Sequence, residues 1–221
     1  MKKVVFAATG ASGAGLFIKL VNAAKDSCEA HVIVSKNALK VLEAEENLRL
    51  NLDDLGVKIY DDQDLGAGPA SGSFGTEAMI IAPCSTNTLA KVANGISDTL
   101  ITRAASVALK ERQGLVLGVR EMPFSAISLR QMHELSLLGA VVAPPILGGY
   151  SGENLDQIER LIIGKWLDLC GIKHEIYSRW QGKNLDEIYT DRIGEFSMQK
   201  QDKQSNNFNT QNLENNEIIF K

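Results

Sequence analysis

The chain has 221 residues, of which 44% are hydrophobic and 23% are charged, and its formal net charge is -4 at pH 7. This composition supplies enough apolar side chains for a folded core and excludes a wholly disordered chain. A net negative charge does not favour binding to nucleic acid, and no apolar run reaches the ~20 residues that a membrane helix needs.

Short aliphatic segments alternate with helical segments along the chain. We expect strands at residues 4–8, 31–34, 57–60, 79–82, 115–119 and 140–143, and helices at 16–24, 36–46, 86–93, 99–110, 125–138 and 154–170. The first apolar segment is shorter than the ~7–15 residues of a secretory signal core. Aliphatic strands separated by helices predict an α/β fold, a single doubly wound domain whose parallel sheet is covered on both faces. Ligands of such domains bind beyond the carboxyl ends of the strands.

The composition changes near Lys183. Ten of the residues from 199 to 216 are Asn or Gln, and core-forming residues are few. This pattern predicts a domain at residues 1–182 and a weakly ordered polar tail at 183–221.

Two polar turns follow predicted strands. Residues 10–15 read Gly-Ala-Ser-Gly-Ala-Gly, between a strand and a helix. Backbone N–H groups of such a turn can approach a phosphate, although a tight packing turn would need only one or two of the glycines. Residues 83–88 read Pro-Cys-Ser-Thr-Asn-Thr. Ser85, Thr86 and Thr88 supply three hydroxyl groups, whereas capping a helix needs only one. Both turns are candidate anion sites.

Charged residues stand at two further positions. Arg103 and Lys110 are seven residues apart on one predicted helix and therefore share a face. Arg120 and Glu121 directly follow a predicted buried strand, where a charged pair indicates a site, and Glu121 could exchange a proton. A loop at residues 70–73, Ala-Ser-Gly-Ser, could close over a ligand or simply be a polar surface loop.

Other polar residues favour structural roles. Cys28, Cys84 and Cys170 form no ligand or disulfide pattern, so we expect buried thiols in a reducing cytoplasm. His31, His133 and His174 lack metal-ligand spacing. The acidic run at residues 61–64, which reads Asp-Asp-Gln-Asp, is interpreted as a solvated loop. No metal site is predicted.

Taken together, the motifs resemble the flavin prenyltransferase family of the UbiX type, formerly described as hydroxybenzoate carboxy-lyases. The matching segments occur in family order over residues 1–182. They are Gly10-Ala11-Ser12-Gly13-Ala14, Val34-Ser35-Lys36, Ala70-Ser71-Gly72-Ser73, Pro83-Cys84-Ser85-Thr86-Asn87-Thr88-Leu89, Arg103-Ala104-Ala105, Ala108-Leu109-Lys110-Glu111-Arg112, Val119-Arg120-Glu121, Gly139-Ala140-Val141, Tyr150 and Arg179-Trp180.

The resemblance implies a Rossmann-like or flavodoxin-like domain that transfers the dimethylallyl group of dimethylallyl phosphate to N5 and C6 of reduced FMN without a metal. It implies a cytoplasmic homo-oligomer, a dodecamer, that delivers prenylated FMN to a partner decarboxylase in ubiquinone biosynthesis or aromatic acid decarboxylation. By residue matching, the FMN-binding residues are Gly10, Ala11, Ser12, Ser35, Ser85, Thr86, Asn87, Thr88 and Arg120. The resemblance implies that the catalytic residues are Glu121, Lys110, Arg103 and Ser12. It also implies that the residues binding the prenyl phosphate are Tyr150, Lys165, Arg103, Lys110 and Ser71.

One departure from the family pattern concerns the last predicted helix. The family often has an arginine there, and Lys165 stands in its place, which keeps the charge but loses the bidentate fork. Two alternatives stay open at this point: a flavin-dependent decarboxylase acting on a cysteinyl carboxylate, which would use an active-site histidine, and a non-catalytic flavin carrier in which Arg120 and Glu121 form a structural ion pair.

Overall fold

The computed structural model describes residues 1–46, 52–147 and 154–179. The chain divides into two units, Met1–Tyr177 and Ser178–Lys221. The predicted domain boundary between residues 182 and 183 and the predicted tail lie outside the described residues and stay predictions. Among the described residues, no helix combines the length and the apolar character needed to cross a membrane.

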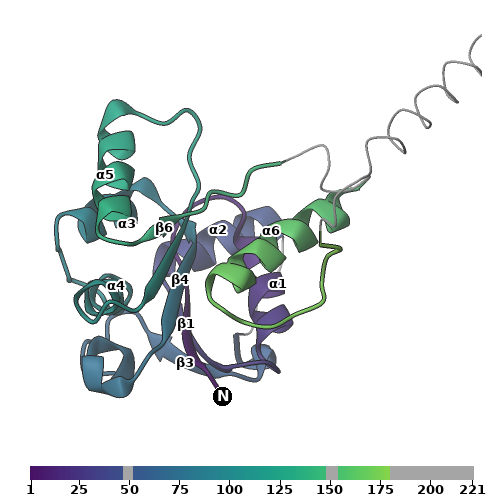
Figure 1. Ribbon diagram of the computed structural model, residues 1–221, viewed down its shortest axis with the longest axis horizontal. Coiled ribbons are helices and arrows are strands. Elements are labelled where there is room, and N and C mark those ends of the chain that lie inside the picture. The colour runs from purple at the N-terminus through teal and green to yellow at the C-terminus, as the bar shows by residue number, and fades with distance from the viewer. Residues whose placement is uncertain (47–51, 148–153, 180–221) are drawn as a thin grey trace, which may run out of the picture. The chain divides into compact units, whose positions relative to one another are not determined.

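A parallel sheet of six strands forms the centre of the first unit (Figure 1). Its order is β3-β2-β1-β4-β5-β6, and every neighbouring pair is parallel. The strands are β1 (Lys3–Ala8), β2 (Glu29–Val34), β3 (Lys58–Asp61), β4 (Ala78–Cys84), β5 (Gly114–Val119) and β6 (Val141–Val142). This topology confirms the predicted doubly wound α/β fold.

Helices cover both faces of this sheet (Figure 1). One face packs against α1 (Ala14–Ala24), α2 (Lys36–Glu46) and α6 (Leu155–Leu169), and the other against α3 (Thr86–Ala93), α4 (Leu100–Lys110) and α5 (Ala126–Leu137). Neighbouring residues of β1 alternate between the two cores: Phe6 packs on the α1 side and Val5 on the α4 side. Both side chains are buried because the sheet has a helical layer on each face.

Two of the differences from the predicted strand limits concern β4 and β6. β4 continues through Pro83 and Cys84 rather than ending before Pro83, and its pairing with β5 becomes irregular between Ile81 and Cys84. A proline lacks the N–H that a regular ladder needs, and such an irregularity accommodates it. β6 shrinks to two residues at the sheet edge, where pairing on one side alone supports it.

Candidate functional site

The strand order reverses direction between β1 and β4, where ligands of doubly wound folds bind. Thr9 joins the carboxyl ends of these two strands. Its Oγ1 donates to the carbonyl oxygen of Pro83 at 3.1 Å and accepts the N–H of Ser85 at 2.8 Å. These bonds fix the start of the glycine-rich turn relative to the start of α3.

A cavity of about 570 Å³ opens beside this point. It is walled by the segments that follow β1, β2, β3 and β4 and by parts of α3 and α4. Its lining residues are Thr9, Gly10, Ser35, Lys36, Asn37, Asp62, Gln63, Ser85, Thr86, Asn87, Thr88, Lys91, Thr99, Ile101 and Thr102. Six of the nine predicted FMN-binding residues are in this lining: Gly10, Ser35, Ser85, Thr86, Asn87 and Thr88.

The donor set of the cavity fits FMN. Hydroxyl and amide side chains dominate the lining, and such groups suit the ribityl hydroxyls and the phosphate. Its volume falls in the ~300–1,000 Å³ range of small-molecule pockets. Ser85 caps α3 by accepting the N–H of Thr88, and its hydroxyl lies 3.1 Å from Thr88 Oγ1. The cavity therefore has both the size and the chemistry for the flavin.

Glycine is required at position 10 because α2 approaches the turn closely. A Cβ at this position would lie 2.6 Å from the Cβ of Asn37, a distance that real side chains do not adopt. Sequence reasoning missed Asn37 and Thr9 as cavity residues. Both lie within three residues of a strand end, which was the available signal.

Ser12, within the turn, and Arg120 and Glu121, directly after β5, are outside the lining of the cavity. Arg120 Nη2 donates to Ser12 Oγ at 3.5 Å, the long limit of a hydrogen bond. Glu121 is exposed, and its Oε1 accepts the N–H of Met122 at 3.1 Å. Among the described residues, no ion pair joins Arg120 to Glu121, so the structural pair required by the carrier hypothesis does not form in the single chain.

Glu45 is a second residue that sequence reasoning missed. Its carboxylate accepts the N–H of Gly13 at 3.0 Å and the N–H of Ala14 at 3.2 Å. These are the first N–H groups of α1, and Gly13 has no side chain to cap them. A negative charge at a helix N-terminus is favourable. No local motif points to this contact, because Glu45 comes from α2, 31 residues after Ala14.

Asp62 corrects the expectation of a solvated acidic loop. Asp61 and Asp64 are exposed, but Asp62 is buried. Its Oδ1 accepts the N–H of Ile101 at 2.9 Å and its carbonyl oxygen accepts the N–H of Leu100 at 2.7 Å. Asp62 therefore caps α4, and burial raises the pKa of its carboxyl group.

The raised pKa of Asp62 predicts a pH-dependent difference in stability. The folded protein retains the proton at pH values where the unfolded chain, with a pKa of about 3.9, has released it. The wild type thus loses stability as the pH rises through this interval. Asp62→Asn keeps an acceptor for Ile101 but does not titrate. We therefore compare the free energies of unfolding of Asp62→Asn and the wild type. We expect the variant's value, relative to the wild type, to be larger at about pH 7 than at about pH 4. A difference that does not change with pH contradicts this prediction.

Arg103 and Ser71 come together outside the lining of the cavity. Arg103 Nε donates to the carbonyl oxygen of Ala70 at 3.0 Å, and Ser71 Oγ lies 2.9 Å from Ser73 Oγ in the adjoining loop. This loop contains two short 3-10 turns, η2 (Gly68–Ala70) and η3 (Gly72–Phe74). The structure thus brings together two of the residues expected to bind the prenyl phosphate.

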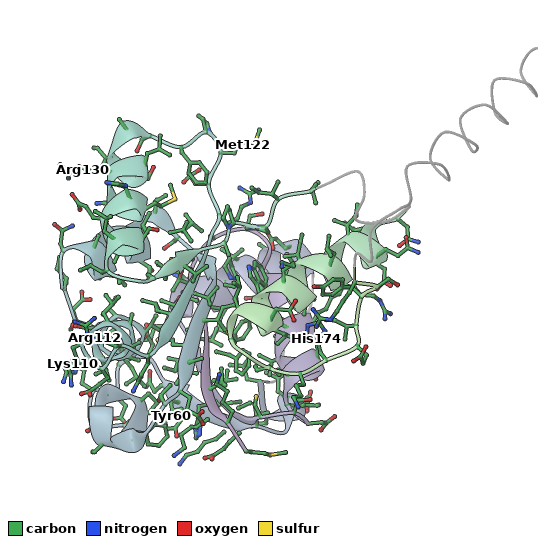
Figure 2. The ribbon with its side chains drawn as sticks, viewed as in Figure 1. Tyr60, Lys110, Arg112, Met122, Arg130 and His174 are labelled. Carbon is green, nitrogen blue, oxygen red and sulfur yellow. The ribbon has the colours of Figure 1, made fainter. Side chains whose placement is uncertain are left out.

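Lys110 does not lie beside Glu121 within one chain. It is exposed at the last turn of α4, where it pairs with Glu111, and it leads to the amino end of β5. Figure 2 shows Met122, the neighbour of Glu121, at the top of the view and Lys110 well apart from it at the lower left. Lys165 is exposed on α6, across the sheet from α4. Tyr150 lies outside the described residues.

The buried thiols and His31 do not provide alternative catalytic groups. Cys28, Cys84 and Cys170 are free and buried, as expected. Burial raises the pKa of Cys84 to about 12, which disfavours a thiolate nucleophile. His31 is buried near the amino end of β2, with its ring nitrogens 3.0 Å from Tyr60 Oη and Glu29 Oε1. That is the opposite edge of the sheet from the cavity, which disfavours the cysteinyl decarboxylase hypothesis.

Among the described residues, no group of three or more His, Cys, Asp or Glu side chains is placed to hold a metal ion.

Comparisons with known proteins agree with this geometry. The family model described as Flavoprotein matches residues 1–165. Flavin prenyltransferase UbiX of Campylobacter jejuni is 45% identical over 186 residues, which are 81% of this chain and 98% of the relative.

Two solved structures are similar over most of their lengths. AnUbiX in complex with FMN and dimethylallyl pyrophosphate has a TM-score of 0.79 and 37% identity, over 83% of this chain and 99% of that one. A dodecameric FMN-dependent Ubix-like decarboxylase from Escherichia coli O157:H7 has a TM-score of 0.76 and 38% identity, over 81% of this chain and all of that one. On the match to the family model and the identity to its curated relatives, this chain belongs to the flavin prenyltransferase family of flavoproteins.

Proposed function

We propose that this protein joins the dimethylallyl group of dimethylallyl phosphate to N5 and C6 of reduced FMN and releases prenylated FMN. The observation that carries the proposal is the cavity at the reversal of strand order, lined by Gly10, Ser35 and residues 85–88 and flanked by Arg120 and Glu121. A relative in complex with FMN and a dimethylallyl donor supports the choice of substrates.

The residues of this chain have separable tasks in this reaction. The hydroxyls of Ser85 and Thr88 and the backbone at Gly10 hold the flavin in the cavity. Reduced FMN, when bound, supplies the two ring atoms that form bonds to the prenyl group. The allylic C–O bond breaks, the phosphate leaves with the bonding electrons, and the fixed charge of Arg120 beside Ser12 stabilises the departing anion. Bonds at N5 and C6 would release two protons from the reduced flavin, of which one would go to the departing phosphate and the other would add, with C6, across the prenyl double bond. Glu121 would carry a proton between these groups.

We propose that a second copy of the chain completes the site, because Lys110 lies far from Met122, the neighbour of Glu121, within one chain (Figure 2). Exposed apolar side chains on α5, beside it in the chain and after β6 support assembly, since exposed apolar surface is typical of interaction sites. They are Met122, Ile127, Leu129, Leu137, Leu138, Ile146 and Leu147. The E. coli relative is dodecameric, which supports a dodecamer for this chain as well. In such an assembly, we expect Arg103, Ser71 and Lys110 of one copy to face the flavin of another, together with Lys165. The role of Tyr150, which lies outside the described residues, stays a prediction.

The biological setting is part of the same proposal. The product would serve a prenylated-FMN-dependent decarboxylase in ubiquinone biosynthesis or aromatic acid breakdown. Three unpaired cysteines support a reducing compartment, the cytoplasm.

The proposed activity is tested by mass spectrometry of the flavin product. The full-length protein, anaerobic reduced FMN and dimethylallyl phosphate are incubated with a metal chelator, and dimethylallyl pyrophosphate replaces the monophosphate in a parallel reaction. We expect a flavin whose mass is increased by one C5 prenyl unit, with the monophosphate and in the presence of chelator. Unchanged FMN contradicts the transferase, and product formed only after a divalent metal is added contradicts the metal-free mechanism.

A further inference from the structure

The cavity contains positive charge that the site residues discussed so far do not explain. Within the described part of the chain, Lys36 and Lys91 are the cations that line it. Lys36 is the first residue of α2, directly after Ser35, and Lys91 lies on α3. The two lysines therefore reach the cavity from different helices.

Lys91 is held in a defined place by its neighbours. It follows Asn87 by four residues and Thr88 by three, so the three side chains share the face of α3 that lines the cavity. Its Nζ lies 2.6 Å from Asp98 Oδ2, and the hydrogen bond from Lys91 is the main cause that lowers the pKa of Asp98. The ion pair restricts the long side chain of Lys91, and its partner Asp98 lies outside the lining of the cavity.

The other candidate position for a phosphate is already filled. The sequence pointed to the glycine-rich turn, whose free N–H groups would face an anion. In the structure, the carboxylate of Glu45 accepts the N–H groups of Gly13 and Ala14. A phosphate dianion bound there would meet this carboxylate at close range and be repelled.

Two carboxylates affect the charge of the two lysines: Asp98 pairs with Lys91 and offsets part of its charge, and Asp62 lines the cavity. Asp62 is committed to the N-terminus of α4 through the N–H of Ile101. The N-terminus of α3, capped by Ser85, also lines the cavity and adds the positive end of a helix dipole, and Lys91 lines it from the last turn of the same helix. The side of the cavity between α2 and α3 is therefore the favourable place for an anion.

We propose that Lys36 and Lys91 bracket the 5′-phosphate of FMN and make the cavity selective for the phosphorylated flavin over riboflavin. This inference rests on the proposed binding of FMN. It orients the flavin so that its phosphate lies between α2 and α3 and its ring lies toward Ser12, Arg120 and Glu121.

The test compares two ligands that differ only in the phosphate. Dissociation constants for FMN and riboflavin are measured by fluorescence quenching for the full-length wild type, Lys36→Gln and Lys91→Gln. Lys40→Gln, which removes an exposed α2 lysine outside the cavity lining, is the matched control. We expect each cavity variant to bind FMN about tenfold more weakly, since a charge-assisted bond to phosphate is lost, and to bind riboflavin as the wild type does. FMN affinity of the wild type should also decrease with added salt more steeply than that of the variants.

The two ligands keep each outcome informative. Unchanged riboflavin affinity shows that a variant is folded, so a loss confined to FMN supports the assignment. Cavity variants that keep the wild-type preference for FMN, or that lose both flavins equally, overturn it. If the wild type binds neither flavin, the proposed function itself fails.

Discussion

Glu121→Gln is expected to retain FMN and to slow formation of the prenylated product by about 10²- to 10⁴-fold, the usual contribution of a general acid–base group. Glu121 lies outside the cavity lining, so its replacement removes no contact with the bound flavin there. Glutamine preserves the size of the side chain and the oxygen that accepts the N–H of Met122, but it cannot take a proton. The defect should therefore appear in the rate of product formation and not in FMN affinity.

The controls for this variant separate charge from proton transfer. Glu121→Asp keeps a carboxylate and should recover part of the rate. Glu134→Gln, at an exposed position of α5, should react as the wild type does. An unchanged rate in Glu121→Gln removes Glu121 from the mechanism.

Lys110→Ala is expected to reduce turnover by about 10²- to 10³-fold, because it removes a fixed charge that stabilises the leaving phosphate. FMN affinity should not change, since Lys110 is at the far end of α4 from the cavity. Arg112→Ala is a matched control, because Arg112 is an exposed cation two residues further on, at the same end of the molecule (Figure 2). Lys110→Arg should keep much of the activity. Equal effects of Lys110→Ala and Arg112→Ala argue against a role for Lys110.

The part of the site that follows the strands could be predicted from sequence because it depends on local pattern. Gly10, Ser35 and Ser85 each come within two residues of a strand end, and the parallel sheet brings those ends to one edge. The same pattern would have identified Thr9 and Asn37 had every residue after a strand been included.

The remaining features depend on contacts between distant segments. The acidic neighbours of Asp62 predict a solvent-exposed side chain, but packing against the start of α4 buries it. Glu45 caps a helix 31 residues before it, which no local motif records. Lys110 shares a helix with Arg103, so helical periodicity placed both on one face, but periodicity does not show which copy of the chain that face meets.

The sharing of one site between copies is tested most directly by mixing two inactive chains. Lys110→Ala and Glu121→Gln subunits carrying different tags are co-expressed, and mixed oligomers are purified through both tags. If Lys110 and Glu121 of different copies form each site, random mixing leaves about one quarter of the sites with both wild-type residues, and activity returns to about that fraction of the wild type. Mixed oligomers that remain as inactive as either parent contradict a shared site, since no single chain then carries both groups.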